Sequence, residues 1–133
     1  MTNQTLLCFD YGEKRIGAAV GQTVSATATE LQTINVKNGK PDWNDIQHLI
    51  DEWQPGILIV GRPLTLDGEQ QEMTVAAERF SRQLKGRFKI DVEMVEEQLS
   101  SYEARRELKS TRDLDPVAAR LILETWLREN IDK

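Results

Sequence analysis

Apolar residues in the first forty positions come in short runs, a pattern typical of β-strands. Such runs cover residues 5–11, 15–21 and about 30–36. Only short turns separate them. We therefore predict three strands that form an antiparallel meander.

Helical periodicity begins after this meander. Pro41 and Asp42 open a predicted helix, and Pro55 and Gly56 end it. Its apolar stripe is Trp43, Ile46, Leu49, Ile50 and Trp53. The all-apolar run 57–60 is then expected of a central parallel strand that is covered on both faces. After a loop at 61–68, a second helix is marked by Met73, Ala76, Ala77, Phe80 and Leu84.

The last third of the chain predicts one more strand and two more helices. Apolar and acidic residues alternate over 90–96, which indicates a fifth strand. Ser100 and Glu103 form a capping box for a third helix. Asp115 is the expected N-cap of the last helix, with Pro116 in its first turn. The expected buried stripe of this helix is Ala118, Ala119, Ile122 and Trp126.

The order of these elements predicts an α/β fold in one domain, residues 1–133. We expect a single five-stranded mixed sheet, with three antiparallel strands followed by parallel strands, flanked by helices. That order matches the ribonuclease H-like fold. Loops at the carboxyl ends of the parallel strands should hold the functional site. Asp10, Glu97 and Asp115 each follow a strand or begin a helix that could converge there.

Composition limits the class of protein. The chain is 39% hydrophobic and 29% charged, which is ordinary for a soluble globular protein. We expect neither a membrane span nor a signal peptide. Cys8 is the only cysteine, so no disulfide can form within the chain; we expect a core residue in a reducing cytoplasm. His48 is the only histidine, which excludes a His-rich zinc site, and it should lie on a solvated helix face.

A carboxylate, Asp10, ends the first apolar run. A buried carboxylate is costly unless something compensates its charge, and a metal ion or a phosphate-bound metal is the usual compensation. An Asp before Gly is also an ordinary turn former. The first strand alone leaves both interpretations open.

Basic residues gather in two stretches of a chain whose net charge is −5. Residues 79–89 hold five basic residues and no acid, and residues 105–112 hold four against one acid. Basic stretches beside acidic segments suit a metal-dependent enzyme that holds a phosphate backbone, whereas solvated helix faces are the alternative. The candidate backbone contacts are Arg82, Lys85, Arg105 and Arg106.

Four ordered motifs give a specific resemblance. They are Asp-x-Gly-x-Lys-Arg-Ile-Gly at 10–17, Val-Gly-x-Pro-Leu-x-x-Asp-Gly at 60–68, Glu-Glu-Gln-Leu-Ser-Ser at 96–101 and Asp-x-x-Ala-Ala at 115–119. On these motifs the chain resembles the YqgF/RuvX family of pre-16S ribosomal RNA nucleases, which are similar in fold to Holliday junction resolvases. The resemblance covers about residues 5–128.

The resemblance implies an acidic triad of Asp10, Glu97 and Asp115, which would hold two Mg²⁺ or Mn²⁺ ions for phosphodiester hydrolysis. Lys14 and Arg15 would hold phosphate oxygens.

The chain also departs from the family pattern. Gln98 stands where the family has Arg, and Arg62 would compensate if it points inward. Glu96 competes with Glu97 as a ligand, and Asp113 competes with Asp115. The segment 110–114 is shorter than in many members.

We therefore expect a nuclease that acts on structured RNA and processes the 5′ end of pre-16S rRNA. The alternatives are a Holliday junction resolvase-like DNA endonuclease and a non-catalytic factor that binds nucleic acid or the ribosome. An actin-like ATP phosphotransferase needs two domains, which this length does not provide. The expected partners are precursor rRNA, the ribosomal particle or DNA junctions, and no membrane. A monomer and a homodimer both remain open.

Overall fold

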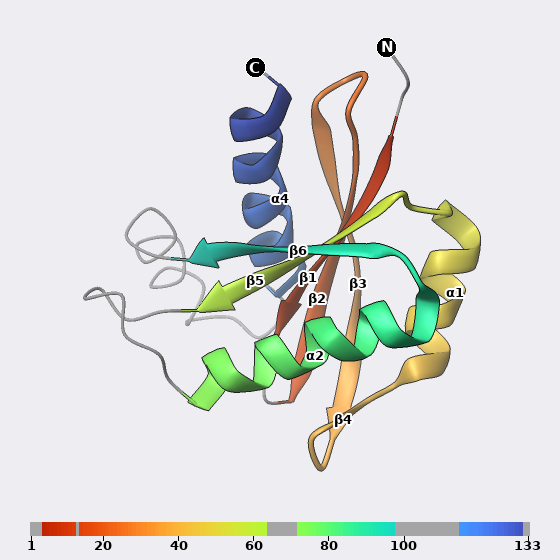
Figure 1. Ribbon diagram of the computed structural model, residues 1–133, viewed down its shortest axis with the longest axis vertical. Coiled ribbons are helices and arrows are strands. Elements are labelled where there is room, and N and C mark those ends of the chain that lie inside the picture. Colours follow the sequence, from red (N-terminus) through yellow and green to blue (C-terminus); the bar gives the residue numbers. More distant parts are fainter. Residues whose placement is uncertain (1–3, 13, 64–71, 98–114, 132–133) are drawn as a thin grey trace.

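A computed structural model describes residues 4–12, 14–63, 72–97 and 115–131 (Figure 1). The strands are β1 (Thr5–Tyr11), β2 (Arg15–Gln22), β3 (Thr27–Lys37), β4 (Lys40–Pro41), β5 (Ile57–Pro63) and β6 (Asp91–Glu97). The helices are α1 (Trp43–Trp53), α2 (Glu72–Phe88) and α4 (Asp115–Ile131). The predicted helix at Ser100 and most of the loop at 61–68 lie outside the described residues.

The strands form one mixed sheet in the order β4-β3-β2-β1-β5-β6. Neighbours from β4 to β1 pair antiparallel, whereas β1–β5 and β5–β6 pair parallel. The predicted mixed α/β fold class is therefore confirmed. The predicted count of five strands is wrong by one, because the two-residue strand β4 folds back onto the end of β3.

The extra strand depends on a tight turn. Asn38 and Gly39 both have positive φ, 53° and 74°, as the two central residues of a type I′ hairpin turn require. Pro41 therefore belongs to β4 and does not open the helix. Asp42, the other residue of the predicted helix start, is the N-cap of α1, and its side chain accepts hydrogen bonds from the backbone N–H groups of Asn44 and Asp45. Strand β3 is also longer than predicted. The sequence did not indicate its added residues, because most of them are exposed and carry no apolar pattern.

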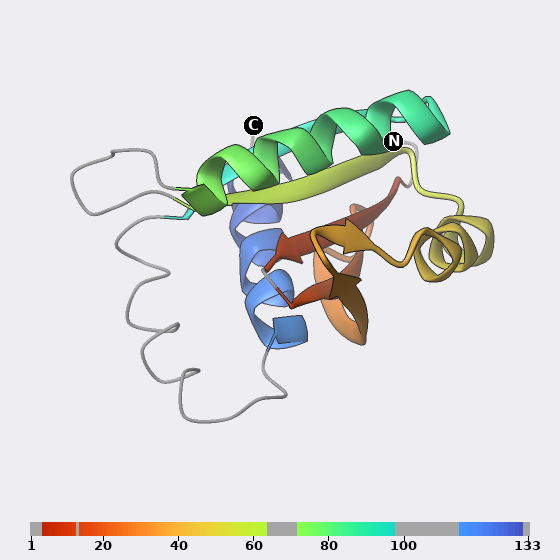
Figure 2. The same cartoon turned by 90° about the horizontal axis from the view of Figure 1, so that it is seen from below.

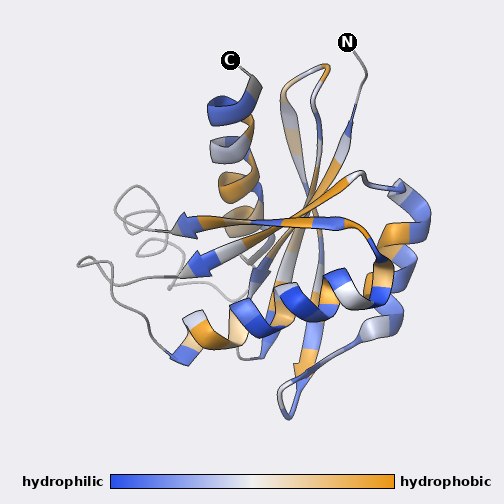
Figure 3. Cartoon of the chain, in the orientation of Figure 1, coloured by the Kyte–Doolittle hydropathy of each residue, from blue (hydrophilic) through white to orange (hydrophobic). Residues whose placement is uncertain are grey.

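Alternating side chains build two apolar layers, one on each face of the sheet. Leu7 and Phe9 of β1 belong to the cluster under α1 and α2. Leu6 and Cys8 belong to the cluster under α4. Figure 2 shows α2 and α4 on opposite sides of the sheet, and Figure 3 shows apolar and polar positions alternating along α2. Cys8 is thus a core residue and His48 is exposed on α1, both as predicted.

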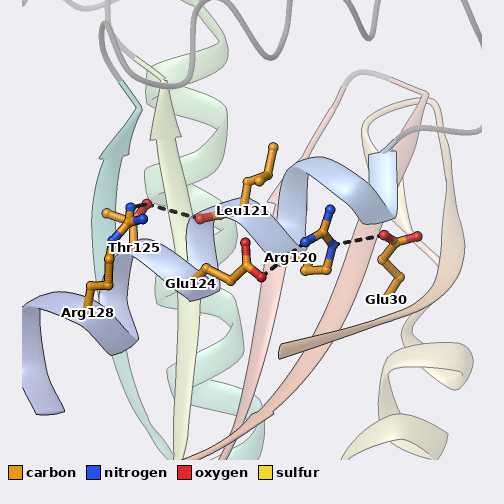
Figure 4. A network of polar contacts seen from close by, with 6 residues as sticks. All are labelled: Glu30, Arg120, Leu121, Glu124, Thr125 and Arg128. Atoms are coloured by element: carbon orange, nitrogen blue, oxygen red, sulfur yellow. Dashed lines mark hydrogen bonds and ion pairs between the residues drawn. The ribbon is translucent and has the colours of Figure 1, made fainter. Parts of the chain in front are cut away.

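Helix α4 covers the second face. Its predicted buried stripe is confirmed, and Leu123 and Leu127 are buried as well. Arg120 ties the helix to the sheet, because its Nε donates to Glu30 Oε2 of β3 at 2.9 Å and its Nη1 donates to Glu124 Oε2 at 3.1 Å (Figure 4). None of the described helices is long and apolar enough to cross a membrane.

Candidate functional site

Asp10 lies near the carboxyl end of β1, with 9% of its surface exposed. It alternates in phase with Leu6 and Cys8, so it belongs to the face that α4 covers. Its partner across β2 is Gly17. On the other side, Gly61 follows Val60, the β5 residue that pairs with Phe9. Neither of these two strand neighbours therefore places a side chain beside this carboxylate.

The turn after Asp10 is closely packed. A Cβ at Gly12 would lie 2.5 Å from the backbone oxygen of Arg15, so this position requires a glycine. Across the turn, the carbonyl of Lys14 accepts a 2.9 Å hydrogen bond from the backbone N–H of Val36 in β3. Lys14 is exposed and Arg15 is partly exposed at the start of β2. The turn therefore holds both basic residues at the edge of the sheet where Asp10 lies.

Tyr11 follows Asp10 and faces the opposite layer, where its ring lies 5.0 Å from that of Phe80. Burial raises the pKa of Tyr11 above its ordinary value of 10.0, and the nearby charge of Arg79 lowers it by a smaller amount. Tyr11 therefore stays protonated near neutral pH, and its ring packs in the core under α2.

The two glutamates at the end of β6 occupy opposite faces of the sheet. Glu96 alternates in phase with Val92 and Met94, which pack in the layer under α2. Its Oε1 lies 3.5 Å from Nη1 of Arg62. The position of Glu97 is in phase with Val95, which packs in the layer under α4. The backbone register therefore gives Glu97, and not Glu96, the same face as Asp10; the side chain of Glu97 lies outside the description.

Arg62 lies on the layer opposite Asp10. Its Nε donates to Glu78 Oε2 of α2 at 3.0 Å, in addition to its contact with Glu96. Both acids therefore neutralise this guanidinium on the α2 side. Arg62 would compensate for the Arg that Gln98 replaces only if it pointed inward, and its ion pairs hold it on the face opposite Asp10.

Helix α4 begins with Asp115, one residue before its predicted first turn. Leu123 of α4 packs closely on Gly21 of β2, because a Cβ on Gly21 would lie 2.9 Å from Cδ2 of Leu123. This contact relates positions along α4 to positions along β1. Leu6 pairs with Gly21, and Asp10 lies four residues, about 13 Å, further along β1. Asp115 lies eight residues, about 12 Å, before Leu123 on a helix that runs antiparallel to β1 (Figure 1). The start of α4 is therefore level with Asp10. The predicted capping role of the Asp115 side chain lies outside the description.

Of the predicted backbone contacts, the two that are described lie away from this edge. Arg82 and Lys85 are exposed on α2, about one and two turns beyond Glu78 and on the layer opposite Asp10. Arg105, Arg106, Gln98 and Asp113 lie outside the described residues. Among the described side chains, no three of His, Cys, Asp and Glu are close enough to hold a metal ion. The side chains of Glu97 and Asp115 are not among those described.

An open cleft of about 700 Å³ lies beside the β3–β4 hairpin, and sequence reasoning did not find it. Its polar lining is Lys14, Asn35, Lys37, Asn38, Lys40 and Asp42. We call it the hairpin cleft. In the sequence, only the two lysines that flank the Asn-Gly turn indicate this cleft. Lys14 lies beside them because the turn after β1 is hydrogen bonded to β3.

Comparison with known proteins gives close relatives. A family model described as "RuvX: Holliday junction resolvase" matches residues 4–129. A protein of Saccharophagus degradans named "Putative pre-16S rRNA nuclease" is 47% identical over 139 residues, which cover 98% of this chain and 97% of the relative. A protein of Hydrogenovibrio crunogenus with the same name is 48% identical over 120 residues, which cover 90% of each chain.

Solved structures with this fold are more distant in sequence. RuvC of T. thermophilus, in complex with a Holliday junction substrate, superposes with a TM-score of 0.59 at 11% identity and covers 96% of this chain and 97% of its own. The Fowlpox virus resolvase, in complex with Holliday junction DNA, gives 0.58 at 15% identity, with 94% and 97% covered. The ribonuclease H-like fold is thus shared with these resolvases. On the family match and the near-complete coverage of its relatives, this chain belongs to the RuvX family.

Proposed function

We propose that this protein is a nuclease that hydrolyses phosphodiester bonds of structured RNA, and that it processes the 5′ end of pre-16S rRNA in the cytoplasm. The observation that carries the proposal is identity of 47–48% to proteins named for this activity, over 90–98% of the chain. The buried Asp10 at the edge of the sheet gives the activity a chemical centre.

Asp10, Glu97 and Asp115 are the proposed ligands of divalent ions, Mg²⁺ or Mn²⁺. Carboxylate oxygens are the donors that these hard ions prefer. Asp10 fits this role, because it is nearly buried at the end of a strand and its two strand neighbours, Gly17 and Gly61, carry no side chains. The backbone position of Glu97 supports the same assignment, since it shares the face of Asp10 and lies two residues further along the sheet in register. The start of α4 at Asp115 lies level with Asp10.

Two bound ions would supply an activated water and stabilise the leaving oxygen during phosphodiester hydrolysis. The chain's own basic residues then have a separate task. Lys14 and Arg15 follow the turn after Asp10, where their charges can hold phosphate oxygens of the substrate. Arg82, Lys85, Arg105 and Arg106 are proposed to contact the backbone further from the scissile bond. Arg62 is a weaker candidate, because Glu78 and Glu96 already neutralise it.

Cleavage of precursor 16S rRNA by the purified protein tests this proposal. We expect cleavage with Mg²⁺ or Mn²⁺, none with EDTA, and none by Asp10→Asn at the same protein concentration. Glu96→Gln is the matched control, because it removes a carboxylate one residue from Glu97 but on the opposite face. Cleavage by Asp10→Asn at the wild-type rate would remove this carboxylate from the mechanism.

A second candidate function is cleavage of DNA junctions. The family model carries the description of a Holliday junction resolvase, which favours this alternative. A four-way DNA junction run beside the precursor RNA, at equal concentrations, decides between them. Faster cleavage of the junction would show that DNA junctions, and not RNA, are the preferred substrate. The proposed metal ligands would stay the same. Binding of either nucleic acid without cleavage would indicate a non-catalytic binding factor.

A further inference from the structure

We propose that the hairpin cleft is a binding site for the sugar–phosphate backbone of a nucleic acid duplex, and this inference rests on the proposed nuclease function. Lys14, Lys37 and Lys40 line the cleft, with Asp42 as its only acid. The cleft therefore carries a net positive charge on a chain whose net charge is −5. This local reversal of sign favours a polyanionic partner.

The charges of the cleft are available to a ligand. None of the ion pairs formed among the described residues involves Lys14, Lys37 or Lys40. The carboxylate of Asp42 is engaged elsewhere, since its Oδ1 accepts from the backbone N–H groups of Asn44 at 3.1 Å and Asp45 at 3.4 Å. The cleft thus holds three ammonium groups against one carboxylate, and none of the ion pairs among the described residues joins them.

The hairpin also pairs like charges directly. Lys37 lies opposite Lys40 in the register of β3 and β4. Like charges at directly opposed positions destabilise a strand pair. The turn itself does not need them, because Asn38 and Gly39 already supply its backbone conformation. A bound phosphate between the two lysines would turn this repulsion into attraction.

The position of the cleft suits a substrate that passes Asp10. Lys14 lies four residues after Asp10, and its carbonyl is hydrogen bonded to Val36 of β3. Arg15 pairs with Asn35 of β3. Lys37 lies two residues further along β3, which is a distance of about 7 Å. A basic path thus leads from the edge that carries Asp10 to the tip of the hairpin, which Figure 1 shows as the lower end of the sheet.

The lining indicates contact with the backbone of the nucleic acid. Lysines and asparagines provide the polar lining, while Val36 and Pro41 complete it. Proteins that bind single strands stack bases on aromatic side chains, and the residues of this lining include none. Lysine contacts with phosphates bind without regard to sequence and depend strongly on salt.

Binding of a fluorescently labelled RNA stem-loop, measured by anisotropy in EDTA from about 50 to about 200 mM KCl, tests this inference. For Lys37→Gln/Lys40→Gln we expect a loss of at least about tenfold in affinity at 0.1 M salt. The slope of log K against log salt should fall by about one unit for each lost phosphate contact. Lys37→Arg/Lys40→Arg should bind like the wild type, because it keeps both charges.

Arg128→Glu is the control for net charge, since it also changes the charge by two units and lies in the last turn of α4. An equal loss of affinity in this control would overturn the inference, because the effect would then follow net charge alone. An unchanged salt slope in the glutamine variant would also overturn the inference. If that variant aggregates as well, the lysines protect the edge of the sheet.

The two proposals fail in different ways. Hairpin-dependent binding by a protein that cleaves neither RNA nor DNA would overturn the proposed function and support this inference. Metal-dependent cleavage with an unchanged salt slope in the glutamine variant would overturn this inference alone. Thermal melting should show that Lys37→Gln/Lys40→Gln is at least as stable as the wild type, because the variant relieves repulsion between opposed lysines.

Discussion

At the scale of single residues, Asp10 stands out because a strand otherwise buried in apolar layers ends in a carboxylate that is 9% exposed. Burying an ionised carboxylate costs free energy unless hydrogen bonds or opposite charges offset that cost. Three carboxylates converging at one edge would also repel each other. The proposed triad would therefore destabilise the fold when no cation is bound.

Substitutions at Asp115 separate two possible roles of this residue. Asn caps a helix about as well as Asp, whereas Ala costs about 1 kcal/mol. A metal ligand also needs the charge, which Asn lacks. We expect Asp115→Asn to keep the melting temperature within a few degrees and to lose most RNA cleavage, and Asp115→Ala to lose both stability and activity.

The control for this experiment is Asp113→Asn. If Asp113→Asn is inactive while Asp115→Asn cleaves normally, the third ligand is Asp113. If Asp115→Asn is neutral in both stability and cleavage, and Asp113→Asn is active too, Asp115 serves only as a helix cap.

At the scale of elements, the turn between β1 and β2 fixes the relation between Asp10 and the basic residues that follow it. Its closest packing is at Gly12, where a Cβ would meet a backbone oxygen at 2.5 Å. Backbone atoms cannot rotate away as a flexible side chain can. The turn must therefore deform if any other residue stands there, and Lys14 and Arg15 must move with it.

We expect Gly12→Ala to destabilise the protein by about 1 to 3 kcal/mol and to weaken RNA binding. Gly86→Ala is the matched control, because nothing lies within 4 Å of a Cβ at that exposed helical position. Ala favours a helix over Gly by up to about 1 kcal/mol, so the control should be slightly stabilised. Urea denaturation of both variants measures the difference. Equal stabilities for Gly12→Ala and the wild type would contradict the close packing of the turn.

At the scale of the whole molecule, the basic residues lie on separate surfaces. Arg82 and Lys85 lie on α2, across the sheet from the face of Asp10, whereas the hairpin cleft lies at the far edge of the sheet. The two surfaces are nevertheless joined through Trp43, which follows the cleft residue Asp42 and stacks on Phe80 of α2 with 5.7 Å between the ring centroids. A nucleic acid that touches both surfaces must therefore extend beyond the cleft.

We expect Arg82→Gln/Lys85→Gln to weaken binding of long precursor RNA and to lower its salt slope by about one unit per lost phosphate contact. The loss should add to that of Lys37→Gln/Lys40→Gln, because no ion pair or hydrogen bond among the described residues joins the two pairs and they would hold separate phosphates. A short stem-loop should be less sensitive to the α2 variant. Unchanged affinity for both RNAs would show that Arg82 and Lys85 form a solvated helix face.

The sequence by itself determined the fold class, the order of the elements and the family. These depend on local features, namely the period of the apolar residues, the prolines and glycines that end elements, and motifs of consecutive residues. The burial of Cys8, the exposure of His48 and the apolar stripe of α4 followed from the same features. Strand β4 was missed, because two residues carry no period and only the turn at Asn38 and Gly39 marks them.

Only the tertiary structure decided which side chains meet. Adjacent glutamates in a strand look equivalent in a sequence, yet the pleat sends Glu96 to Arg62 on one face and gives Glu97 the register of the other. The sequence also left open which way the side chain of Arg62 points, and the packing of α2 places Glu78 within hydrogen-bond distance of it. The hairpin cleft joins Lys14 to lysines more than twenty residues away. Such contacts depend on strand pairing and helix docking, which no short segment of the chain encodes alone.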